Sequence, residues 1–389
     1  MIQTPIFNDT IGIMTVVTLI PAFYLWLEKR VKWKIFNYFP AIIWIFITPI
    51  IFSNLGIIPK SSPVYGTFKA FAVPMFIILM LLDINIRESF KVAWRSVGVL
   101  IVGCVGIVVG ASVAFYLFRW GLAPGSWSGF GALAGSWIGG TGNLAAVAES
   151  LNTPPDQVGI VVLVDNLVYI VYFPIILLSV RWAKIFNRFT RVSKKEIEHF
   201  NKDAAEIEQK SHEIHFTDVI TLMAVGFACI LVARWLSALL PEIPPVFSTK
   251  TWAMLIITTL GIILSATKLK KVPGTKPLSL MFVYIYMTMM GAMADLNNIG
   301  GAYWFLVAGF LCIAIHFLFV TIASRLFRVD VSMAAIASVA AVGGAASAPV
   351  AAGYHREELV PISIMLALIG YALGNYLGIA TAYLCHLFV

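Results

Sequence analysis

The sequence predicts an all-α polytopic membrane protein built from two inverted-topology repeats, each with a broken or re-entrant glycine-rich helix. Three observations lead to this fold class. The 389 residues are 60% hydrophobic and only 12% charged, with a mean hydropathy of +0.90, a composition far from that of a soluble domain. The loops rich in Lys and Arg are the odd-numbered ones in the first half of the chain and the even-numbered ones in the second half. A Gly-Gly pair interrupts an apolar stretch in each half, at 139–140 and at 343–344.

Apolar stretches long enough to cross a bilayer occur about twelve times along the chain. A spanning helix needs about 20 mostly apolar residues. The first stretch follows no basic segment, and no small-residue cleavage site comes after it, so we expect no removable signal peptide. The stretches lie near residues 9–27, 36–57, 66–85, 95–118, 129–151, 158–180, 216–240, 250–267, 279–297, 301–324, 331–352 and 360–386.

Cysteine and charge content narrow the function classes. The four cysteines lie within apolar stretches, without C-x-x-C spacing or a nearby histidine cluster, and we interpret them as small packing residues. The net charge of +8 is typical of basic cytoplasmic loops and does not indicate a nucleic-acid partner. We expect a multi-pass protein in the lipid bilayer of the bacterial cytoplasmic (inner) membrane. The cysteines are Cys104, Cys229, Cys312 and Cys385.

The Lys and Arg residues predict which loops are cytoplasmic, because short cytoplasmic loops are rich in them. In the first half, the loops after the first and third stretches are basic. From the sixth stretch onward, the even-numbered loops are basic instead. Residues 129–180 must therefore cross the membrane an odd number of times, although they contain two apolar stretches. The basic residues are Lys29, Arg30, Lys32, Lys34, Arg87, Lys91 and Arg95, then eight between Arg181 and Lys210, and Lys268, Lys270, Lys271, Lys276, Arg325 and Arg328.

The segment GSWIGGTGNLAAVAES, at residues 135–150, is the stretch that does not cross as an ordinary helix. Each glycine costs a helix about 1 kcal/mol relative to alanine. We therefore predict a re-entrant hairpin here, or a helix that is broken in the middle of the membrane.

A matching segment in the second half indicates an internal repeat. MAAIASVAAVGGAASAPVAAG, at 333–353, carries its Gly-Gly pair where the first half carries 139–140. Asp83 and Asp295 each end an apolar stretch, and the last helix of each half bears Asn166 or Asn375. With five full crossings, each half enters the membrane inverted relative to the other, which is typical of secondary transporters whose site lies at the breaks.

The domain boundaries follow from this repeat. We predict a first inverted repeat over 1–180, a charged cytoplasmic linker over 181–215, and a second inverted repeat over 216–389. The linker alternates charges of opposite sign, as a solvated helix does.

The broken segments offer backbone groups as ligands. Unpaired N–H and C=O groups in hydrocarbon cost several kcal/mol each, so a broken helix persists only beside protein or a wet cavity. Freed carbonyls can bind a cation, whereas the N-terminus of a half-helix can bind a carboxylate. Close helix packing is the alternative reason for glycines, and we favour it for Gly106 with Gly110 and for Gly374 with Gly378.

Asp165, in VVLVDNLVYIVYF, is the strongest candidate for an ion-binding side chain. A carboxylate at the bilayer centre costs on the order of 2.5–3.5 kcal/mol and so needs a reason. Burial favours its protonated form, whereas bound Na⁺ would keep it ionised. Asn166 should face roughly 100° away on a helix, so we do not expect both side chains to reach one ligand. A sodium site would take Asp165 and Asn143.

Other polar residues are weaker candidates. Glu149, like Asp83 and Asp295, lies near the end of a stretch, where it marks either an interface or a functional site. His316 is interpreted as a hydrogen-bonded core residue more readily than as a proton relay. Arg234 can extend to the nearby membrane surface, and is a weaker candidate for holding an anionic substrate.

The segment SWIGGTGNLAAVAESL, followed by LVDNLVYIVYF, resembles the YjcL-like bacterial membrane proteins over nearly the whole chain. That family is placed with the cation:proton antiporter and anion transporter superfamily. The resemblance implies inverted repeats, broken helices, a homodimer and an elevator-type movement of a core domain against a scaffold. In the antiporters of that group an Asn-Asp or Asp-Asp pair follows the broken helix, whereas the order here is Asp165-Asn166, which leaves the ion stoichiometry open.

The leading hypothesis is an ion-coupled carrier, driven by Na⁺ or H⁺ and without another cofactor, for a small organic anion, amino acid or short peptide. The alternative is a Na⁺/H⁺ antiporter without an organic substrate. A membrane-embedded enzyme is disfavoured because the sequence has neither H-E-x-x-H nor G-x-S-x-G. The candidate ion-binding residues are Asp165, Asn166, Asn143 and Thr141, and the candidate substrate-binding residues are Gly139, Gly140, Gly142, Gly343, Gly344, Ser347 and Asn375.

Overall fold

The computed structural model describes residues 5–31, 33, 36, 41–82, 86–192, 213–294 and 302–389. Over these residues the chain forms helices joined by loops and short 3-10 turns. The helices are α1 (Thr10–Val31), α3 (Ala41–Asn54), α4 (Pro63–Leu82), α5 (Ile86–Phe118), α6 (Ser126–Ser150), α7 (Pro155–Leu178), α8 (Ala183–Thr190), α10 (Phe216–Ser237), α11 (Thr249–Ser265), α12 (Thr275–Met293), α13 (Ala302–Phe327), α14 (Val331–Val342), α15 (Gly344–His355) and α16 (Val360–His386).

The apolar stretches of the sequence coincide with these helices, and 331–352 coincides with the pair α14 and α15. Within the described ranges, seven helices are long and apolar enough to cross a membrane. The prediction of an all-α, multi-pass membrane protein is therefore confirmed. These helices cover Thr10–Val31, Pro63–Leu82, Trp94–Gly121, Pro155–Thr190, Phe216–Ser237, Ala302–Phe327 and Glu357–His386.

Two sequence predictions concern residues that the structure does not describe. Asp83 and Asp295, which support the internal repeat, lie outside the described residues, as does the linker over 193–212. The described start of the linker forms the short helix α8. One helix differs in extent, because α5 begins at Ile86, well before the apolar stretch predicted from residue 95. Its first turns contain charged residues that a prediction from hydropathy leaves out, namely Arg87, Glu88 and Lys91.

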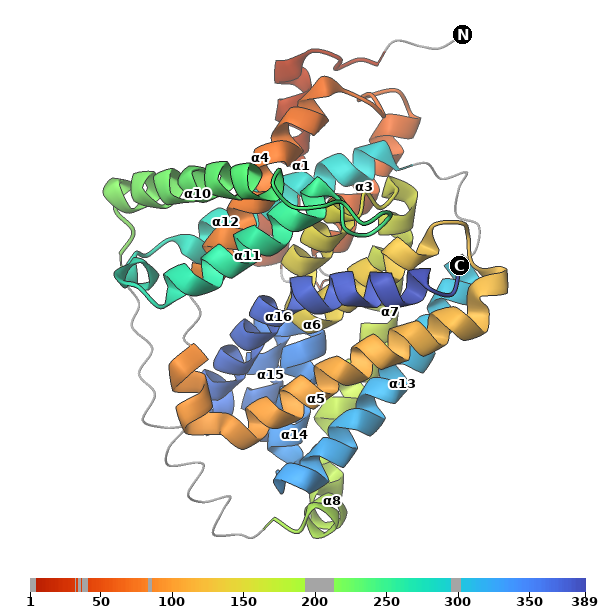
Figure 1. Ribbon diagram of the computed structural model, residues 1–389, viewed down its shortest axis with the longest axis vertical. Coiled ribbons are helices and arrows are strands. Elements are labelled where there is room, and N and C mark those ends of the chain that lie inside the picture. Colours follow the sequence, from red (N-terminus) through yellow and green to blue (C-terminus); the bar gives the residue numbers. More distant parts are fainter. Residues whose placement is uncertain are drawn as a thin grey trace.

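The helices form two bundles, which Figure 1 shows in the upper and lower parts of the view. We call the upper one the flanking bundle, which contains α1, α3, α4, α10, α11 and α12. We call the lower one the hairpin bundle, which contains α5, α6, α7, α13, α14, α15 and α16. Each bundle takes consecutive helices from both halves of the chain, so the two halves are interleaved and are not separate lobes.

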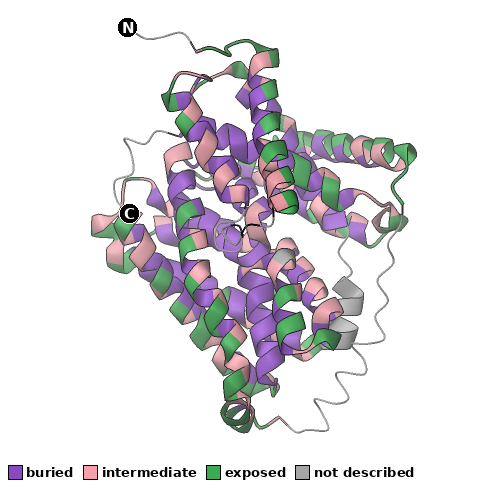
Figure 2. Ribbon diagram, turned by 180° about the vertical axis from the view of Figure 1, so that it is seen from behind, coloured by how far each residue is buried: buried purple, intermediate pink, exposed green. Residues whose placement is uncertain are grey.

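Burial follows the pattern expected of a protein in lipid. Figure 2 shows buried residues concentrated along the inner helices, whereas exposed residues run along the outward faces of the peripheral ones. The exposed residues include many large apolar side chains, such as Leu231 and Trp235 on α10 and Leu326 on α13, which are 71%, 68% and 72% exposed. A bilayer would cover such surfaces.

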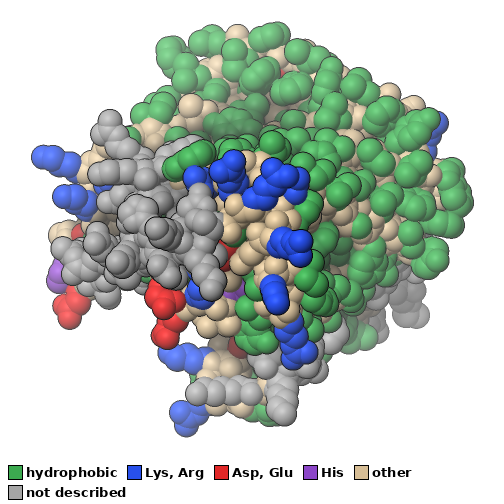
Figure 3. Space-filling view, turned by 90° about the horizontal axis from the view of Figure 1, so that it is seen from below, with side chains coloured by type: hydrophobic (Ala, Val, Ile, Leu, Met, Phe, Trp, Pro, Cys, Tyr) green, Lys and Arg blue, Asp and Glu red, His purple; other side chains and the backbone are tan. Residues whose placement is uncertain are grey.

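Basic side chains mark one end of the molecule. Figure 3 shows Lys and Arg gathered together on one face, beside a broad hydrophobic surface. The exposed basic residues of α8, its flanking turns and the end of α13 belong to this end: Arg181, Lys184, Arg188, Arg191, Arg325 and Arg328. We call it the basic end, and the positive-inside rule predicts that it is the cytoplasmic one.

The glycine-rich helix α6 is a hairpin. A Cβ added at Gly131 would lie 3.1 Å from Leu151 Cδ1, and one added at Gly135 would lie 3.0 Å from Val147 Cγ2. In a straight helix, residues 131 and 151 would be roughly 30 Å apart. The arms 126–139 and 142–150 therefore run antiparallel on either side of Gly140, where the backbone leaves the helical region. Of the two sequence-based alternatives, the re-entrant hairpin is the one observed.

A second hairpin is formed by α14 and α15. Arg356, which follows α15, makes an ion pair of 2.7 Å with Asp330, the residue that caps the start of α14. These residues would be roughly 39 Å apart on a continuous helix. The chain therefore reverses at Gly343 and Gly344, and both arms return to one base.

The two hairpins enter from opposite ends, and α7 runs from one base to the other. Gln157, at the start of α7, accepts a hydrogen bond from Ser126 at the base of the first hairpin. The carbonyl of Ile176, near the end of α7, makes a hydrogen bond of 3.1 Å with His355 at the base of the second hairpin. About nineteen helical residues span roughly 29 Å, which is the thickness of a bilayer core. Asp165 lies near the middle of this helix.

Candidate functional site

The tips of the two hairpins meet in the hairpin bundle. Gly140 has φ 78° and ψ −173°, a conformation open essentially only to glycine, and Gly344 has a φ of 60°. A Cβ added at Gly344 would lie 3.9 Å from Gly140 Cα, and the ring of Tyr371 borders both glycines. Both breaks predicted from the Gly-Gly pairs are therefore present, and they face each other.

A cavity of about 340 Å³ lies beside these tips. Both hairpins contribute backbone to its wall, as do α7, α16 and several helix ends of the flanking bundle. The tip residues that line it are Gly139, Gly140, Thr141, Gly142, Gly343 and Gly344. All six of these tip residues were predicted from the sequence as site residues, and they border one space.

The cavity extends toward the basic end. It is bordered by Glu28 near the end of α1, by Met80 near the end of α4, and by Ser279 near the start of α12. These helix ends adjoin the basic loops that follow α1 and α4 and precede α12. The base of the first hairpin lies at the opposite end, where Ser150 O accepts a hydrogen bond from Thr251 at the start of α11.

Asp165 lines the cavity and is fixed by two donors of the first hairpin. The Ser136 hydroxyl donates to Oδ2 at 2.8 Å, and the Trp137 indole N–H donates to Oδ1 at 2.7 Å. Both carboxylate oxygens therefore accept hydrogen bonds, an arrangement that suits the ionised form. Each oxygen retains lone pairs for a cation.

Two tyrosines and a serine complete the polar wall. The Tyr169 hydroxyl is buried close to Ser347, but it makes no hydrogen bond of ordinary geometry with the described residues. The Tyr371 hydroxyl accepts a hydrogen bond of 3.3 Å from the N–H of Ala345, in the first turn of α15. Ser347 also lines the cavity, so this predicted residue lies within reach of a solute there.

Asn166 and Thr141 line the cavity together with Asp165. The sequence suggested that Asn166 would face away from Asp165, but both residues border the same cavity. The Asn166 amide donates to Val162 O at 2.7 Å within its own helix, which leaves its carbonyl oxygen for another partner.

Asn143 and Asn375 are brought together, but away from the cavity lining. The Asn143 amide nitrogen donates to Tyr371 O at 3.0 Å and to Asn375 Oδ1 at 3.1 Å, and the Asn375 amide donates to Thr258 at 2.9 Å. Gly139 and Gly374 lie against the Asn143 amide on either side. The structure therefore does not bring Asn143 beside Asp165 on the wall of the cavity, because the short second arm of the hairpin turns it toward α16.

The remaining sequence interpretations concern packing. Gly106 and Gly110 on α5 face α13, and Gly374 and Gly378 on α16 face α6, so both pairs allow close helix packing as predicted. His316 is buried and bonded to Gly103 O at 2.8 Å and to Ser338 at 2.9 Å. The core-residue interpretation of this histidine agrees with these bonds.

Several functional candidates escaped sequence reasoning. Ser136 and Trp137 were not recognised as partners of Asp165, nor Tyr169, Tyr371 and Glu28 as cavity residues. Serine and tyrosine are common in membrane helices, and their direction depends on how the broken helices turn. The spacing of Ser136 and Trp137 just before the Gly-Gly pair is the one signal that could have identified them.

The arrangement can hold both a cation and an anionic group. The carboxylate of Asp165, the Asn166 carbonyl and backbone carbonyls at the hairpin tips are oxygen ligands of the kind that Na⁺ accepts. Helix α15 begins at the tip, so its N-terminus presents N–H groups and a partial positive charge there.

Comparison with known proteins agrees with this membrane architecture. The chain is 30% identical over 365 residues to the "Uncharacterized membrane protein YjcL" of Bacillus subtilis (strain 168), which covers 90% of this chain and 91% of the relative. A family model described as "Protein of unknown function (DUF819)" matches residues 15–388. With that match over nearly its whole length, the chain belongs to the DUF819 family of membrane proteins.

Proposed function

We propose that this protein is an ion-coupled secondary transporter for a small organic anion, amino acid or short peptide. The observation that carries the proposal is the meeting of two opposed helical hairpins at glycine tips beside a cavity that contains Asp165. Interrupted helices are costly in a membrane and are tolerated where they line a binding cavity. A purely structural helix bundle gains nothing from two such interruptions at one place.

Asp165 is the proposed coupling residue. Its two hydrogen bonds hold the carboxylate at the level of the tips, where it can bind Na⁺ or carry H⁺. Thr141, Asn166 and carbonyls at Gly139 and Gly140 are the proposed additional ion ligands. No cofactor beyond the coupling ion enters the proposal.

The solute site is proposed beside the ion. Ser347, Tyr169 and the start of α15 offer hydroxyl and N–H donors to a carboxylate, and Tyr371 borders both tips. A volume of about 340 Å³ suits a molecule of amino-acid or dipeptide size and is larger than a bare ion needs. This volume favours an organic solute over the alternative of a simple Na⁺/H⁺ antiporter.

The proposed mechanism is alternating access by movement of the hairpin bundle against the flanking bundle. The inverted repeat expected from the sequence is proposed to pair α1 with α10, α3 with α11 and α4 with α12, and likewise the hairpin-bearing helices. The extension of the cavity toward the basic end supports the proposal that this conformation faces the cytoplasm. We further propose a homodimer in the bacterial cytoplasmic membrane, within the cation:proton antiporter and anion transporter superfamily.

Uptake into proteoliposomes tests the proposal. Amino acids, dipeptides and dicarboxylates should each be assayed with a Na⁺ gradient, with a H⁺ gradient and with neither. We expect at least one solute to accumulate with one gradient, and Asp165→Asn to abolish this coupling. Asp156→Asn, at the start of the same helix and outside the cavity lining, is the matched control and should leave coupling intact.

The results separate the alternatives. Movement of Na⁺ against H⁺ with no solute accumulation would favour the antiporter. Coupling that is the same in wild type and in Asp165→Asn would contradict the assignment of this residue. The absence of both solute and ion movement would contradict a transporter altogether.

A further inference from the structure

A second cavity, of about 460 Å³, lies at the end of the molecule opposite the basic end. It is formed by α4, α10 and α11 and by the base of the first hairpin. Its residues include the last turns of α10 and the first turn of α11, on either side of the loop over 238–248. It shares none of its lining residues with the cavity that contains Asp165.

The charge inside this second cavity is predominantly positive. Lys69, Arg234 and Lys250 line it, and Glu149 is the one carboxylate among its described lining residues. The Arg234 side chain makes no hydrogen bond or ion pair with any residue that the structure describes. Positive charge at the non-cytoplasmic end runs against the usual distribution of Lys and Arg and therefore needs a reason.

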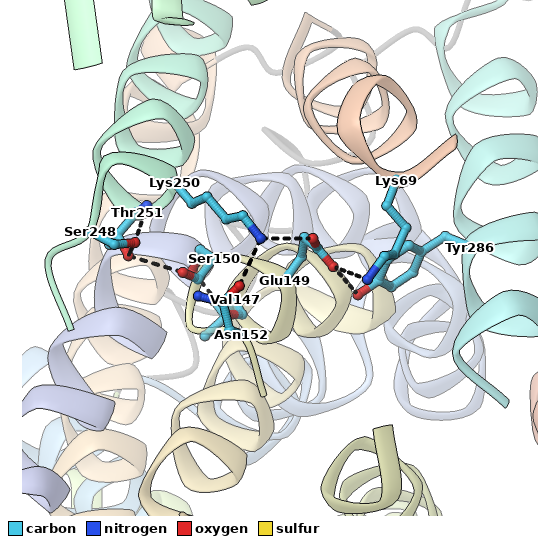
Figure 4. Close-up of polar contacts among 9 residues, drawn as sticks. All are labelled: Lys69, Val147, Glu149, Ser150, Asn152, Ser248, Lys250, Thr251 and Tyr286. Atoms are coloured by element: carbon cyan, nitrogen blue, oxygen red, sulfur yellow. Dashed lines mark hydrogen bonds and ion pairs between the residues drawn. The ribbon is translucent and has the colours of Figure 1, made fainter. Parts of the chain in front are cut away.

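Glu149 neutralises the lysines only loosely. Its carboxylate lies 3.3 Å from Lys69 Nζ and 3.8 Å from Lys250 Nζ, and Tyr286 donates a hydrogen bond of 3.4 Å. Charge-assisted hydrogen bonds are normally about 2.7–2.9 Å long. Figure 4 shows Glu149 between the two lysines, with Lys250 also donating to Asn152.

Most of the rest of the wall is apolar, with Ser237 and Thr249 as its other polar residues. Val73, Pro74, Ile230, Met254 and Ile257 line the cavity beside the charged groups. A ligand that suits both parts has an anionic head and a short apolar body. A purely inorganic anion would leave the apolar wall uncovered, and a neutral apolar molecule would leave Arg234 without a partner.

We propose that this second cavity binds an amphiphilic anion, whose carboxylate or phosphate is held by Lys69, Arg234 and Lys250 in place of Glu149. The binding site stands independently of the transport activity proposed above. Its consequence for movement rests on that proposed function: Glu149 belongs to the hairpin bundle and the two lysines to the flanking bundle. An anion that takes the lysines from Glu149 would remove an ionic link between the bundles at this end.

Calorimetric titration of the purified protein in neutral detergent tests the site, at constant ionic strength because salt screens such contacts. The probes are hexanoate and hexyl phosphate, with acetate and hexan-1-ol as partial ligands that carry only the head or only the body. We expect saturable binding of the two amphiphilic anions and at least about tenfold weaker binding of acetate and hexan-1-ol, because each loses one set of contacts.

Two substitutions distinguish this site from any other. Arg234→Gln should weaken hexanoate binding about threefold to fivefold, as for loss of one exposed ion pair. Glu149→Gln should strengthen it by about threefold or more, because the competing carboxylate is gone. Arg119→Gln is the matched control: Arg119 is an exposed cation that lies over the Tyr116 ring, outside this cavity. It should leave the affinity unchanged.

The proposal is overturned if hexanoate and hexyl phosphate do not bind. It is also overturned if Arg234→Gln binds hexanoate as tightly as the wild type and the Arg119→Gln control do. Weaker binding in Glu149→Gln would also overturn it, because Glu149 would then assist the ligand.

Nanodiscs identify the source of the anion. Loss of hexanoate binding in phosphatidylglycerol, but not in phosphatidylcholine, would support the site with a lipid headgroup as occupant. Binding in both would support it with a soluble anion. Repeating the titration with Asp165→Asn, which should bind normally, separates this result from any failure of transport.

Discussion

The hydrogen bond from Trp137 to Asp165 gives the sharpest test of how the hairpin fixes its carboxylate. Trp137→Phe removes the indole N–H that donates to Asp165 at 2.7 Å, and Asp165→Ala removes its acceptor. Trp137 is fully buried, so the single substitution also loses packing contacts. A double-mutant cycle cancels that packing loss and isolates the interaction between the two side chains.

A hydrogen bond to a charged group contributes about 1.5–3 kcal/mol to stability. The coupling energy of the cycle should therefore be about 1.5–3 kcal/mol if Asp165 is ionised. For a neutral acid it should fall to about 0.5–1.5 kcal/mol, because neither partner would be charged. The measured value thus also reports the charge state of the carboxyl group.

The assay is reversible unfolding in mixed micelles with increasing SDS, followed by far-ultraviolet circular dichroism. The control cycle pairs Asp165→Ala with Trp252→Phe, whose indole donates to Pro241 O at 2.8 Å elsewhere in the protein. We expect no coupling there. A Trp137–Asp165 coupling below about 0.5 kcal/mol, which is the usual error of additivity, would refute the reasoning.

Four further predictions address the tips, the core, the topology and the outer loop. Gly140→Ala should cost about 1–3 kcal/mol in unfolding free energy and Gly344→Ala about 1–2 kcal/mol, because alanine is strained at both backbone conformations although space remains around each Cβ; equal stability to wild type in SDS unfolding would count against the tip geometry. His316→Leu should lower the free energy of unfolding by about 1–3 kcal/mol, because Ser338 and Gly103 O lose a buried partner. The same substitution should leave ion-coupled uptake intact. Loss of coupling at full stability would instead assign His316 as a proton relay. A cysteine placed at Asn152 should react with a membrane-impermeant maleimide only from outside, and one placed at Glu357 only from inside, because the hairpin bases lie at opposite ends. Labelling of both cysteines from the same side would contradict opposed hairpins. Hydrogen bonds from the Thr249 side chain and backbone lower the pKa of Glu242, so their contribution to stability is present at neutral pH and is lost as the pH falls through the lowered pKa. Glu242→Gln should therefore reduce Tm at neutral pH but not in acid. A reduction in Tm that is the same at every pH would contradict the lowered pKa.

Hydropathy and glycine content were sufficient to predict the helices and the two breaks. Glycine is costly in helices, so the pairs at 139–140 and 343–344 have few structural explanations other than a reversal of the chain. The change from odd-numbered to even-numbered basic loops predicted that residues 129–180 cross the membrane an odd number of times. One hairpin followed by one crossing helix meets this condition. The depth of Asp165 followed from its distance to both ends of one apolar stretch.

The directions of side chains around the breaks could not be predicted in the same way. Helical periodicity assigns faces only while the helix continues, and a reversal at Gly140 resets the phase for Asn143. The partners of Asp165 come from another segment of the chain, so their distance depends on tertiary packing. The sequence left the role of Glu149 open between an interface and a functional site, because its lysine partners are distant in sequence.

The helix α7 carries Asp165 at its centre and is hydrogen-bonded near its two ends to the bases of both hairpins. It therefore fixes the distance between the two hairpin bases. Any displacement of the hairpin bundle must take the carboxylate and both glycine turns along together, without altering the distances among them. In the proposed transport cycle, affinity for a bound ion should consequently change little during translocation, and the energetic difference between the two orientations would arise where the bundle slides past its neighbours.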